Sequence, residues 1–217
     1  MGGRPDRIVA HFMTSAPSLK ECPDTGVPEV AVAGRSNSGK SSVLNQLTRN
    51  RQLARTSKTP GRTQLLNFFE TSLGGRLVDL PGYGYARVAK SQKHVWEDSV
   101  EDYLARREDL VGVVLVMDIR HLFEPFDVMM INWAIHTKLP MHVLLNKADK
   151  LKHGACTQAF RTARQRLESS QFSLQMFSAL TGLGRDEAIE KLSAWLTPRP
   201  MEALLSQHPQ PGPSDAE

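Results

Sequence analysis

A glycine-rich octapeptide between an apolar run and a helical segment constrains the fold of this chain more than any other feature. Residues 29–33 have the composition of a short buried strand, Gly34–Ser41 reads G-x-x-x-x-G-K-S, and residues 40–48 have helical spacing. Gly34 and Gly39 permit backbone angles and close approaches that a Cβ atom would prevent. The loop then points main-chain N–H groups inward at a helix N-terminus, which predicts a phosphate-binding site.

Side chains around this loop suit a nucleotide with bound magnesium. Lys40 is expected to reach the β- and γ-phosphates, and the Ser41 hydroxyl is expected to bind Mg²⁺. The D-x-x-G sequence at residues 79–82 ends a predicted strand, 39 residues after Lys40. There the Asp79 carboxylate is placed to hold Mg²⁺ through water, and the Gly82 N–H is placed to contact the γ-phosphate.

A basic segment upstream of that strand holds two threonines that could complete the metal site. Thr59-Pro-Gly-Arg-Thr63 precedes a predicted strand at residues 65–71. A threonine hydroxyl here completes Mg²⁺ coordination when a γ-phosphate is present; Thr63 borders the strand and is the first choice, and Thr59 is the second. Either would make the loop ordered with a triphosphate and loose after hydrolysis.

The sequence Asn146-Lys-Ala-Asp149, directly after an apolar strand-like run, predicts a pocket for guanine. The Asp149 carboxylate can accept hydrogen bonds from the N1–H and the 2-amino group of guanine. Adenine would leave that carboxylate unpaired, at a cost on the order of a few kcal/mol. Asn146 can tie this loop to the phosphate loop, and the stem of Lys147 can cover one face of the base. In Phe177-Ser-Ala179 the N–H of Ala179 is placed to bond the guanine O6.

Strands and helices alternate along the chain, which predicts a doubly wound α/β sheet with helices on both faces. The expected strands cover residues 29–33, 65–71, 76–79, 110–117, 141–145 and 173–177, and the expected helices cover 40–48, 94–106, 126–136, 157–168 and 185–196. Residues 1–26 are expected to form an arm with one short strand near Ile8–Ala10, residues 27–200 the domain, and residues 201–217 a disordered proline-rich tail.

The distribution of charge allows two interpretations, a solvated face or a surface for a polyanionic partner. The 217 residues carry 27 Lys and Arg against 23 Asp and Glu, and five cations without an acid lie between Thr48 and Arg62. This segment suits nucleic acid, with a plain solvated face as the alternative. No apolar run is long enough to insert into a membrane, no signal peptide is evident, and Cys22 and Cys156 have no ligand-like neighbours. We therefore expect a cytoplasmic protein without a disulfide scaffold or zinc site.

Five motifs in this order resemble those of Ras-like GTPases, and their details resemble the EngB family of GTP-binding proteins. They are GRSNSGKSS at residues 34–42, TPGRTQ at 59–64, DLPGYGY at 79–85, DIRH at 118–121 and NKAD at 146–149. The resemblance covers residues 27–197, about four-fifths of the chain. It implies an α/β, Ras-like P-loop GTPase domain, whose six-stranded, mostly parallel sheet has the order 2-3-1-4-5-6, one antiparallel strand and helices on both faces.

The resemblance also implies a role and completes the expected site. The role is that of a bacterial GTP-binding protein, expected as a monomer, that is needed for cell division and septation. It would assist late assembly of the large ribosomal subunit, with precursor rRNA and ribosomal proteins as partners. The resemblance marks Ser41 and Thr63 as Mg²⁺ ligands, and Lys40, Thr63 and Gly82 are the expected catalytic residues. The residues expected to bind GTP or GDP are Gly34, Arg35, Ser36, Asn37, Ser38, Gly39, Lys40, Ser41, Gly61, Arg62, Thr63, Gln64, Leu65, Asp79, Leu80, Pro81, Gly82, Asn146, Lys147, Ala148, Asp149, Phe177, Ser178 and Ala179.

The residue after the D-x-x-G sequence predicts slow hydrolysis. Many GTPases place a glutamine there to orient the attacking water, but this chain has Tyr83, so we expect a slow intrinsic rate that a partner raises. In related GTPases an asparagine at the position of Asn37 helps to hold K⁺ against the phosphates; a loop-shaping hydrogen bond is the equal alternative. Asp118 and Arg120 are interpreted as a structural ion pair or helix cap.

Two other classes of function stay open. A P-loop phosphotransferase would share the phosphate loop, although the NKAD and FSA sequences and the lack of an arginine-rich lid argue against it. A septation protein that uses GTP for assembly is the other, although no coiled-coil or polymerisation pattern is present. Trp96, Trp133 and Trp195 are interpreted as packing residues rather than platforms for RNA bases.

Overall fold

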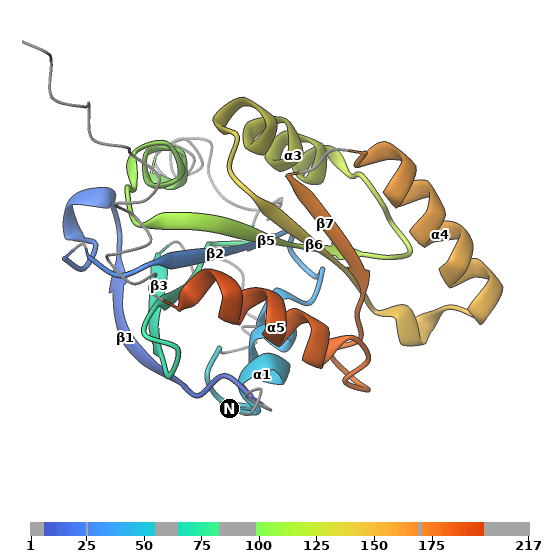
Figure 1. Ribbon diagram of the computed structural model, residues 1–217, viewed down its shortest axis with the longest axis horizontal. Helices are drawn as coiled ribbons and strands as arrows, with labels where there is room; N and C mark the ends of the chain where they lie inside the picture. The colour runs from blue at the N-terminus through green and yellow to red at the C-terminus, as the bar shows by residue number, and fades with distance from the viewer. Residues whose placement is uncertain (1–6, 25, 55–64, 83–98, 169–170, 198–217) are drawn as a thin grey trace, which may run out of the picture.

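The computed structural model describes residues 7–24, 26–54, 65–82, 99–168 and 171–197, in which a seven-stranded sheet lies between two layers of helices (Figure 1). The strands are β1 (Ala10–Ala16), β2 (Glu29–Gly34), β3 (Leu66–Thr71), β4 (Arg76–Asp79), β5 (Leu110–Asp118), β6 (Met141–Asn146) and β7 (Phe172–Met176). The helices are α1 (Lys40–Thr48), α3 (Pro125–Thr137), α4 (His153–Arg166) and α5 (Arg185–Leu196), with 3₁₀ turns η1 (Leu19–Glu21) and η2 (Ala148–Lys150). Residues 99–106 are helical as well.

The strand order among the described residues is β1-β3-β4-β2-β5-β6-β7, and β3 is the strand that runs against its neighbours. Without β1 this is the expected order 2-3-1-4-5-6, so the predicted fold class is confirmed. The expected count of six strands is corrected to seven, because β1 pairs with β3 at the edge of the sheet. A short strand was expected near Ile8–Ala10, whereas β1 begins at Ala10. A register shift between Phe12 and Thr14 breaks the alternation of side chains that would have revealed β1 in the sequence.

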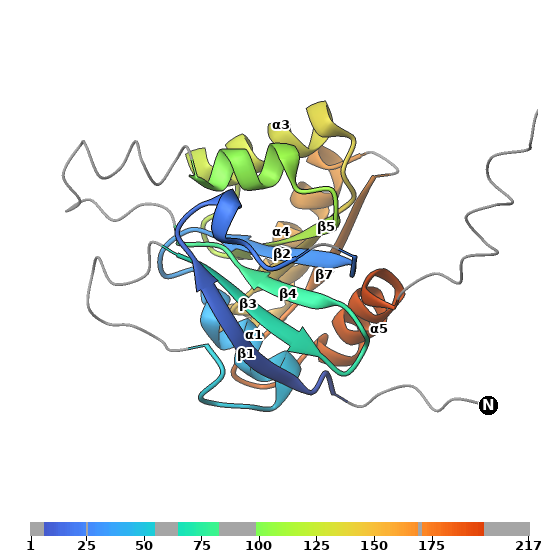
Figure 2. The same ribbon diagram turned by 90° about the vertical axis from the view of Figure 1, so that its left-hand side faces the viewer.

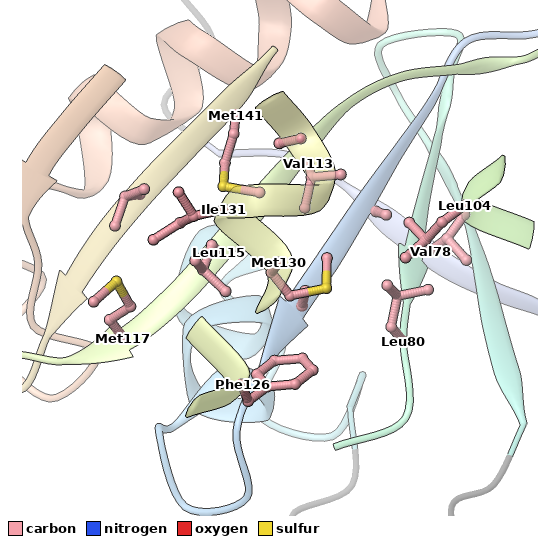
Figure 3. Packing of buried hydrophobic residues seen from close by; sticks show 14 of the residues in the cluster. Val78, Leu80, Leu104, Val113, Leu115, Met117, Phe126, Met130, Ile131 and Met141 are labelled. Carbon is pink, nitrogen blue, oxygen red and sulfur yellow. The ribbon is translucent and has the colours of Figure 1, made fainter. Parts of the chain in front are cut away.

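Helices α1 and α5 pack on one face of the sheet, and α3, α4 and the helix at residues 99–106 pack on the other (Figures 1 and 2). The interior strand β5 is buried at every residue except Val111. Its Val114 and Val116 belong to the core under α1 and α5, and its Val113 and Leu115 face α3 (Figure 3). A strand covered on both faces has no polar side, so its sequence reads as a continuous apolar run.

Helix α3 begins one residue before the predicted start, with Pro125 in its first turn. The Asp127 carboxylate accepts a hydrogen bond of 3.1 Å from the N–H of Glu124, which completes a capping box at this end. Asp127 is only 2% exposed, and this burial raises its pKa to about 6. The cap fixes the turn that leads from β5 into α3.

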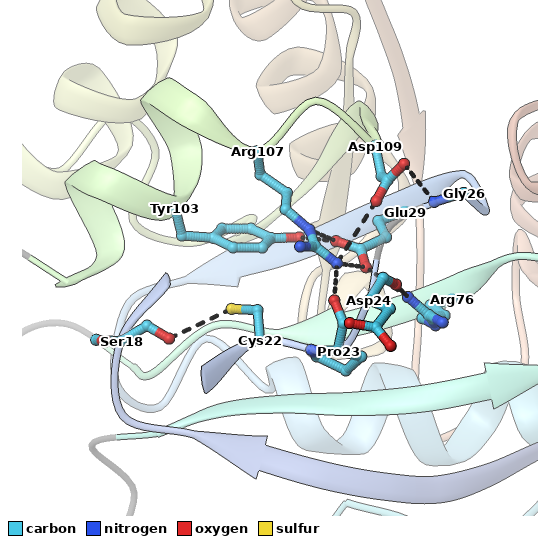
Figure 4. A network of polar contacts seen from close by, with 10 residues as sticks. All are labelled: Ser18, Cys22, Pro23, Asp24, Gly26, Glu29, Arg76, Tyr103, Arg107 and Asp109. Atoms are coloured by element: carbon cyan, nitrogen blue, oxygen red, sulfur yellow. Dashed lines mark hydrogen bonds and ion pairs between the residues drawn. The ribbon is translucent and has the colours of Figure 1, made fainter. Parts of the chain in front are cut away.

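A buried ion network holds the sheet together where β2 and β4 begin (Figure 4). Glu29 is fully buried and accepts hydrogen bonds of 2.8 and 2.9 Å from the guanidinium of Arg107 and one of 3.0 Å from the Tyr103 hydroxyl. Arg76 adds an ion pair of 3.3 Å, and Arg107 also donates to the Pro23 carbonyl. Burial and the nearby Glu29 raise the pKa of Tyr103, so its hydroxyl stays a donor. The network ties the segment before β2 to the end of the helix at residues 99–106.

The fold also shows where the described tryptophans and the helix expected at residues 94–106 lie. Trp133 and Trp195 pack against the two cores, as predicted, and Trp96 lies outside the described residues. The helix expected at residues 94–106 is present from 99 to 106, and its earlier part and the tail at 201–217 lie outside the described residues. Within the part of the chain that the structure describes, no helix combines the length and apolarity needed to cross a membrane.

Candidate nucleotide-binding site

The predicted site residues meet at one edge of the sheet, where its parallel strands end. Gly34 is the last residue of β2, Asp79 of β4, Asp118 of β5 and Asn146 of β6, and Phe177 directly follows β7. Parallel strands end at the same edge of a sheet, and loops at this edge commonly bind ligands. Motifs that are far apart in the sequence therefore converge on one site.

The phosphate loop contains two glycines that have no room for a side chain. Gly39 has a φ of +95°, and a Cβ atom there would lie 2.4 Å from Nδ2 of Asn146. At Gly34 a Cβ atom would lie 2.7 Å from Oγ of Ser38. Asn37 also adopts a left-handed backbone, with a φ of +68°. The buried Ser38 Oγ has no hydrogen-bond partner among the described residues, which is consistent with a loop shaped to receive a polar ligand.

Lys40, the first residue of α1, forms a buried ion pair with Asp79 at the end of β4. Their side chains are 10% and 9% exposed, so each charge depends on the other for compensation. Ser41 follows in the first turn of α1 and is half-buried. A Cβ atom on Gly82 would lie 3.9 Å from the main-chain nitrogen of Ser36, so the D-x-x-G sequence reaches the phosphate loop.

Asn146 couples the phosphate loop to the predicted base pocket. Its Nδ2 donates a hydrogen bond of 2.9 Å to the Ser38 carbonyl, and its Oδ1 accepts one of 3.1 Å from the N–H of Ala179. The predicted tie between Asn146 and the phosphate loop is confirmed. The Ala179 N–H donates to Asn146 Oδ1 in this structure, and its contact with guanine O6 stays a prediction. The sequence could not show that a side chain from β6 accepts this N–H.

Lys147, in the loop at residues 146–149, contacts both β5 and the phosphate loop. Its Nζ donates to the main-chain carbonyl of Asn37 and forms an ion pair of 2.9 Å with Asp118. Arg120 binds the same carboxylate through bonds of 2.9 and 2.7 Å, which confirms the predicted ion pair. Burial opposes ionisation of Asp118, but the hydrogen bonds from Arg120 and Lys147 prevail and hold its pKa below the ordinary value. Asp118 therefore acts as a fixed anchor for Lys147.

Asp149 lines a cavity of 330 Å³ beside the phosphate loop. The Ser178 hydroxyl donates a hydrogen bond of 2.6 Å to Asp149 Oδ1, and this bond lowers the pKa of the carboxyl. Lys150 approaches the other oxygen at 3.4 Å. The cavity is also lined by Gly39, Ser42, Asn146, Lys147, Lys150, Ala179 and Leu180. Its volume falls within the range of small-molecule sites, and an ionised carboxylate is available in its wall.

The predicted loop at residues 59–64 lies outside the described residues, and only its neighbour Leu65 is described. Gly61, Arg62, Thr63 and Gln64 lie outside the described residues, as do Thr59 and Tyr83. Leu65 precedes β3 and is 37% exposed. Among the five cations of the basic segment, Arg49 and Arg51 are described and exposed, and Arg55, Lys58 and Arg62 lie outside the described residues.

The cavity includes three residues that the sequence analysis left out of the site. Ser42, Lys150 and Leu180 each follow directly on a residue of a recognised motif, and this adjacency was the available signal. Leu180 is 74% exposed and presents an apolar side chain next to the cavity. The expected site residues within 34–41, 79–82, 146–149 and 177–179 lie at the same edge of the sheet. Asn37 and Asp149 are exposed, and the others are buried or half-buried.

The fold and these motifs define a P-loop GTPase domain. A family model described as "50S ribosome-binding GTPase" matches residues 29–147, more than half of the chain. Among solved structures, that of a probable GTP-binding protein EngB superposes with a TM-score of 0.64 at 22% identity, covering 79% of this chain and 100% of that one. An Aquifex aeolicus Era variant bound to GDP and AlF₄⁻ superposes with a TM-score of 0.60 at 19% identity, covering 81% of this chain and 58% of that one. At these identities the structures support the fold alone.

Sequence relatives identify the family. The probable GTP-binding protein EngB of Vibrio parahaemolyticus is 50% identical over 190 residues, which cover 87% of each chain. The protein of the same name from Tolumonas auensis is 50% identical over 199 residues, which cover 91% of this chain and 94% of that one. The chain belongs to the EngB family of GTP-binding proteins.

Proposed function

We propose that this protein binds GTP and GDP in the site described above and hydrolyses GTP to GDP and phosphate slowly, at a rate that a partner raises. The observation that carries the proposal is the Asn146 side chain, which joins the phosphate loop to the loop of Ala179. A ligand that fills both the loop and the cavity needs a phosphate at one end and a base at the other. The carboxylate of Asp149 favours guanine over adenine, because adenine has no N1–H or 2-amino group to pair with it.

The residues present fit a magnesium ion. The Ser41 hydroxyl and the Asp79 carboxylate are oxygen donors, which Mg²⁺ prefers, and Thr63 is the proposed further ligand. A bound Mg²⁺ would neutralise phosphate charge. On the protein side, Lys40 must leave its ion pair with Asp79 to reach the phosphates. That exchange would free the Asp79 carboxylate for the metal and its water, so the two groups are expected to change partners together.

Isothermal titration calorimetry with GTP, GDP and ATP, with and without Mg²⁺, tests the proposal. We expect GTP and GDP to bind in preference to ATP, and Lys40→Ala to weaken both. If ATP displaced GDP with comparable affinity, or if Lys40→Ala held nucleotide as firmly as the parent protein, the site would have another function.

We propose that Asn37 helps to hold K⁺ against the phosphates during hydrolysis. Asn37 has a left-handed backbone, and its carbonyl accepts a hydrogen bond from Lys147. The residue is exposed at the phosphate loop. A cation there would supply the positive charge that an arginine finger supplies in other GTPases. Equal hydrolysis rates in K⁺ and Na⁺ buffers would remove this part of the proposal.

We propose that the protein acts in the cytoplasm, as a monomer, in late assembly of the large ribosomal subunit, and that normal cell division and septation depend on it. The family description, which names binding to the 50S ribosome, supports this role. The exposed Arg49 and Arg51 begin the basic segment that would contact rRNA. Sedimentation with large-subunit precursors should show salt-sensitive binding that GTP favours over GDP. Binding that is unchanged between low and high salt would count against this surface.

A further inference from the structure

A groove of 880 Å³ lies between α4 and β7. These two elements lie at the end of the sheet opposite β1 (Figure 1). Its lining includes Phe160, Arg161 and Arg164 of α4, Phe172 and Leu174 of β7, and Glu168 between them. Among the residues that the structure describes, none lines both the groove and the cavity that contains Asp149. A ligand in it would therefore occupy a separate site.

The helix beside the groove is strongly basic. Residues 150–166 contain five fixed cations, Lys150, Lys152, Arg161, Arg164 and Arg166, and no carboxylate. Lys150 is paired with Asp149, and Arg166 stacks on the ring of Phe123 at 4.3 Å. Arg161 and Arg164 are exposed, and neither has an ion-pair partner among the residues that the structure describes. These two guanidinium groups are available to an anionic partner. Glu168 is the one carboxylate among the described residues that line the groove.

Aromatic rings lie next to these charges. Phe160 and Phe172 are half-buried: each packs partly against the core and partly lines the groove. Single-stranded nucleic acid offers phosphates for arginines and flat bases for phenyl rings, and proteins that bind it combine these two features. An acidic peptide would satisfy the charges but would leave the rings without a stacking partner, so the lining favours nucleic acid.

We propose that the groove between α4 and β7 binds a single-stranded segment of RNA, with Arg161 and Arg164 on its phosphates and Phe160 and Phe172 against its bases. The proposal deepens the ribosomal function proposed above and rests on it for the source of the RNA. It adds a surface that does not touch the nucleotide, so binding here is the same with GTP and with GDP. The basic segment that begins at Arg49 would supply the part of binding that depends on the nucleotide.

Fluorescence anisotropy with a labelled single-stranded RNA oligonucleotide tests the groove in the full-length protein loaded with GDP. Arg161→Glu/Arg164→Glu is compared with Arg7→Glu/Lys20→Glu, which makes the same change in net charge at exposed residues far from α4. We expect the groove variant to lose affinity by about tenfold or more, and the slope of log K against log salt to fall by about 1.4, the value for two phosphate contacts. The control should change affinity by less than about threefold.

A second variant separates stacking from charge. Phe160→Leu keeps an apolar side chain for packing and removes the ring, so RNA affinity should fall while the salt slope stays as in the parent. GDP affinity and the thermal unfolding midpoint, measured for each variant, identify any loss of folding. If Phe160→Leu bound RNA as tightly as the parent, the proposed stacking of a base on Phe160 would be refuted.

The outcomes separate this inference from the proposed function. Equal loss in the groove variant and its charge-matched control would overturn the groove as an RNA site, even if the protein still bound large-subunit precursors. Tight binding of an acidic peptide in place of RNA would overturn it as well. Failure of the parent protein to bind precursors, with oligonucleotide binding intact, would instead contradict the ribosomal role.

Discussion

The side chain of Asn146 bonds to the main chain of Ser38 across 108 residues of sequence, with Nδ2 2.9 Å from the carbonyl oxygen. The same side chain accepts the N–H of Ala179. One buried amide thus fixes the distance between the loop that is proposed to hold phosphates and the loops that are proposed to hold the base.

Replacement of Asn146 by alanine should weaken GDP binding by about tenfold to a hundredfold, because two hydrogen bonds of roughly 1 kcal/mol or more each are lost and both loops gain freedom. Titration with a fluorescent GDP analogue measures the affinity. Asn132→Ala, at an exposed position of α3, is the matched control and should leave affinity unchanged. An Asn146→Ala protein that bound GDP like the parent would show that the bridge does not organise the site.

Replacement of Asp149 by asparagine should change the preferred base from guanine to xanthine. The amide presents an N–H that can donate to the 2-oxo group of xanthine, whereas guanine places a donor there. We expect GDP affinity to fall by about a hundredfold and xanthosine diphosphate to bind better than GDP. Competition calorimetry with the two nucleotides measures both changes. Retained preference for GDP would place the base elsewhere than beside Asp149.

Replacement of Gly39 by alanine should abolish tight nucleotide binding and lower the free energy of unfolding by roughly 1–3 kcal/mol. The added Cβ would lie 2.4 Å from Asn146 Nδ2, at a φ of +95° that L-residues rarely adopt. Gly154→Ala is the control, because nothing lies within 4 Å of a Cβ at that helical position. It should raise stability by about 0.5 kcal/mol. Urea denaturation and GDP titration measure both proteins; similar effects for the two would contradict the steric argument.

The buried His142 predicts how stability depends on pH. Its Nε2 donates to Gln175 Oε1 and its Nδ1 accepts from Ser173 Oγ, both at 2.8 Å, an assignment that follows because the Gln175 amide nitrogen donates to the Gly184 carbonyl. Burial lowers the pKa of His142 to about 4. The unfolded chain therefore binds a proton before the folded one does. Stability contributed by the neutral ring should fall as pH drops from about 6.5 to about 4, by roughly 2–3 kcal/mol at most.

The comparison of His142→Gln with His153→Gln, whose ring is exposed, isolates this effect in urea denaturation between pH 4 and 7.5. The first should flatten the pH dependence and the second should not. Asp127 acts in the opposite direction: its raised pKa of about 6 means that stability falls as pH rises from about 4 to 6. The effect of His142 is therefore read from the difference in free energy of unfolding between variant and parent at each pH. If this free energy changed with pH in the same way in both histidine variants, the assignment to His142 would be refuted.

Local signals predicted most of the fold. Strand β5 could be predicted because a strand buried on both faces needs a continuous run of apolar residues. The start of α1 could be predicted because the tight turn before it needs glycine. Strand β1 gave no such signal, since its bulge at Phe12 and Thr14 breaks the alternation of side chains. The network around Glu29 was also invisible, because its partner Arg107 lies 78 residues away and nothing in the sequence pairs them.

The candidate site was predicted better than its internal contacts. Function requires particular residue types at fixed spacing, so Lys40, Asp149 and Asn146 could be chosen from motifs. Their partners depend on how the strands line up: Asp118 meets Lys147 because β5 and β6 are neighbours in register. In the same way, the Ala179 N–H donates a hydrogen bond to Asn146 Oδ1 because β6 and β7 are neighbours. Such pairs follow from tertiary geometry, which a single sequence does not contain.

The distance in sequence between Ser38 and Asn146 has a consequence for how a copy of this protein is made. A chain under synthesis releases its phosphate loop 108 residues before Asn146, and Ala179 comes later still. Until β6 and the residues after β7 have left the exit tunnel, the early loop lacks the hydrogen bond from Asn146. We therefore expect tight nucleotide binding to be among the last events in the maturation of each molecule, after Asn146 and Ala179 are in place.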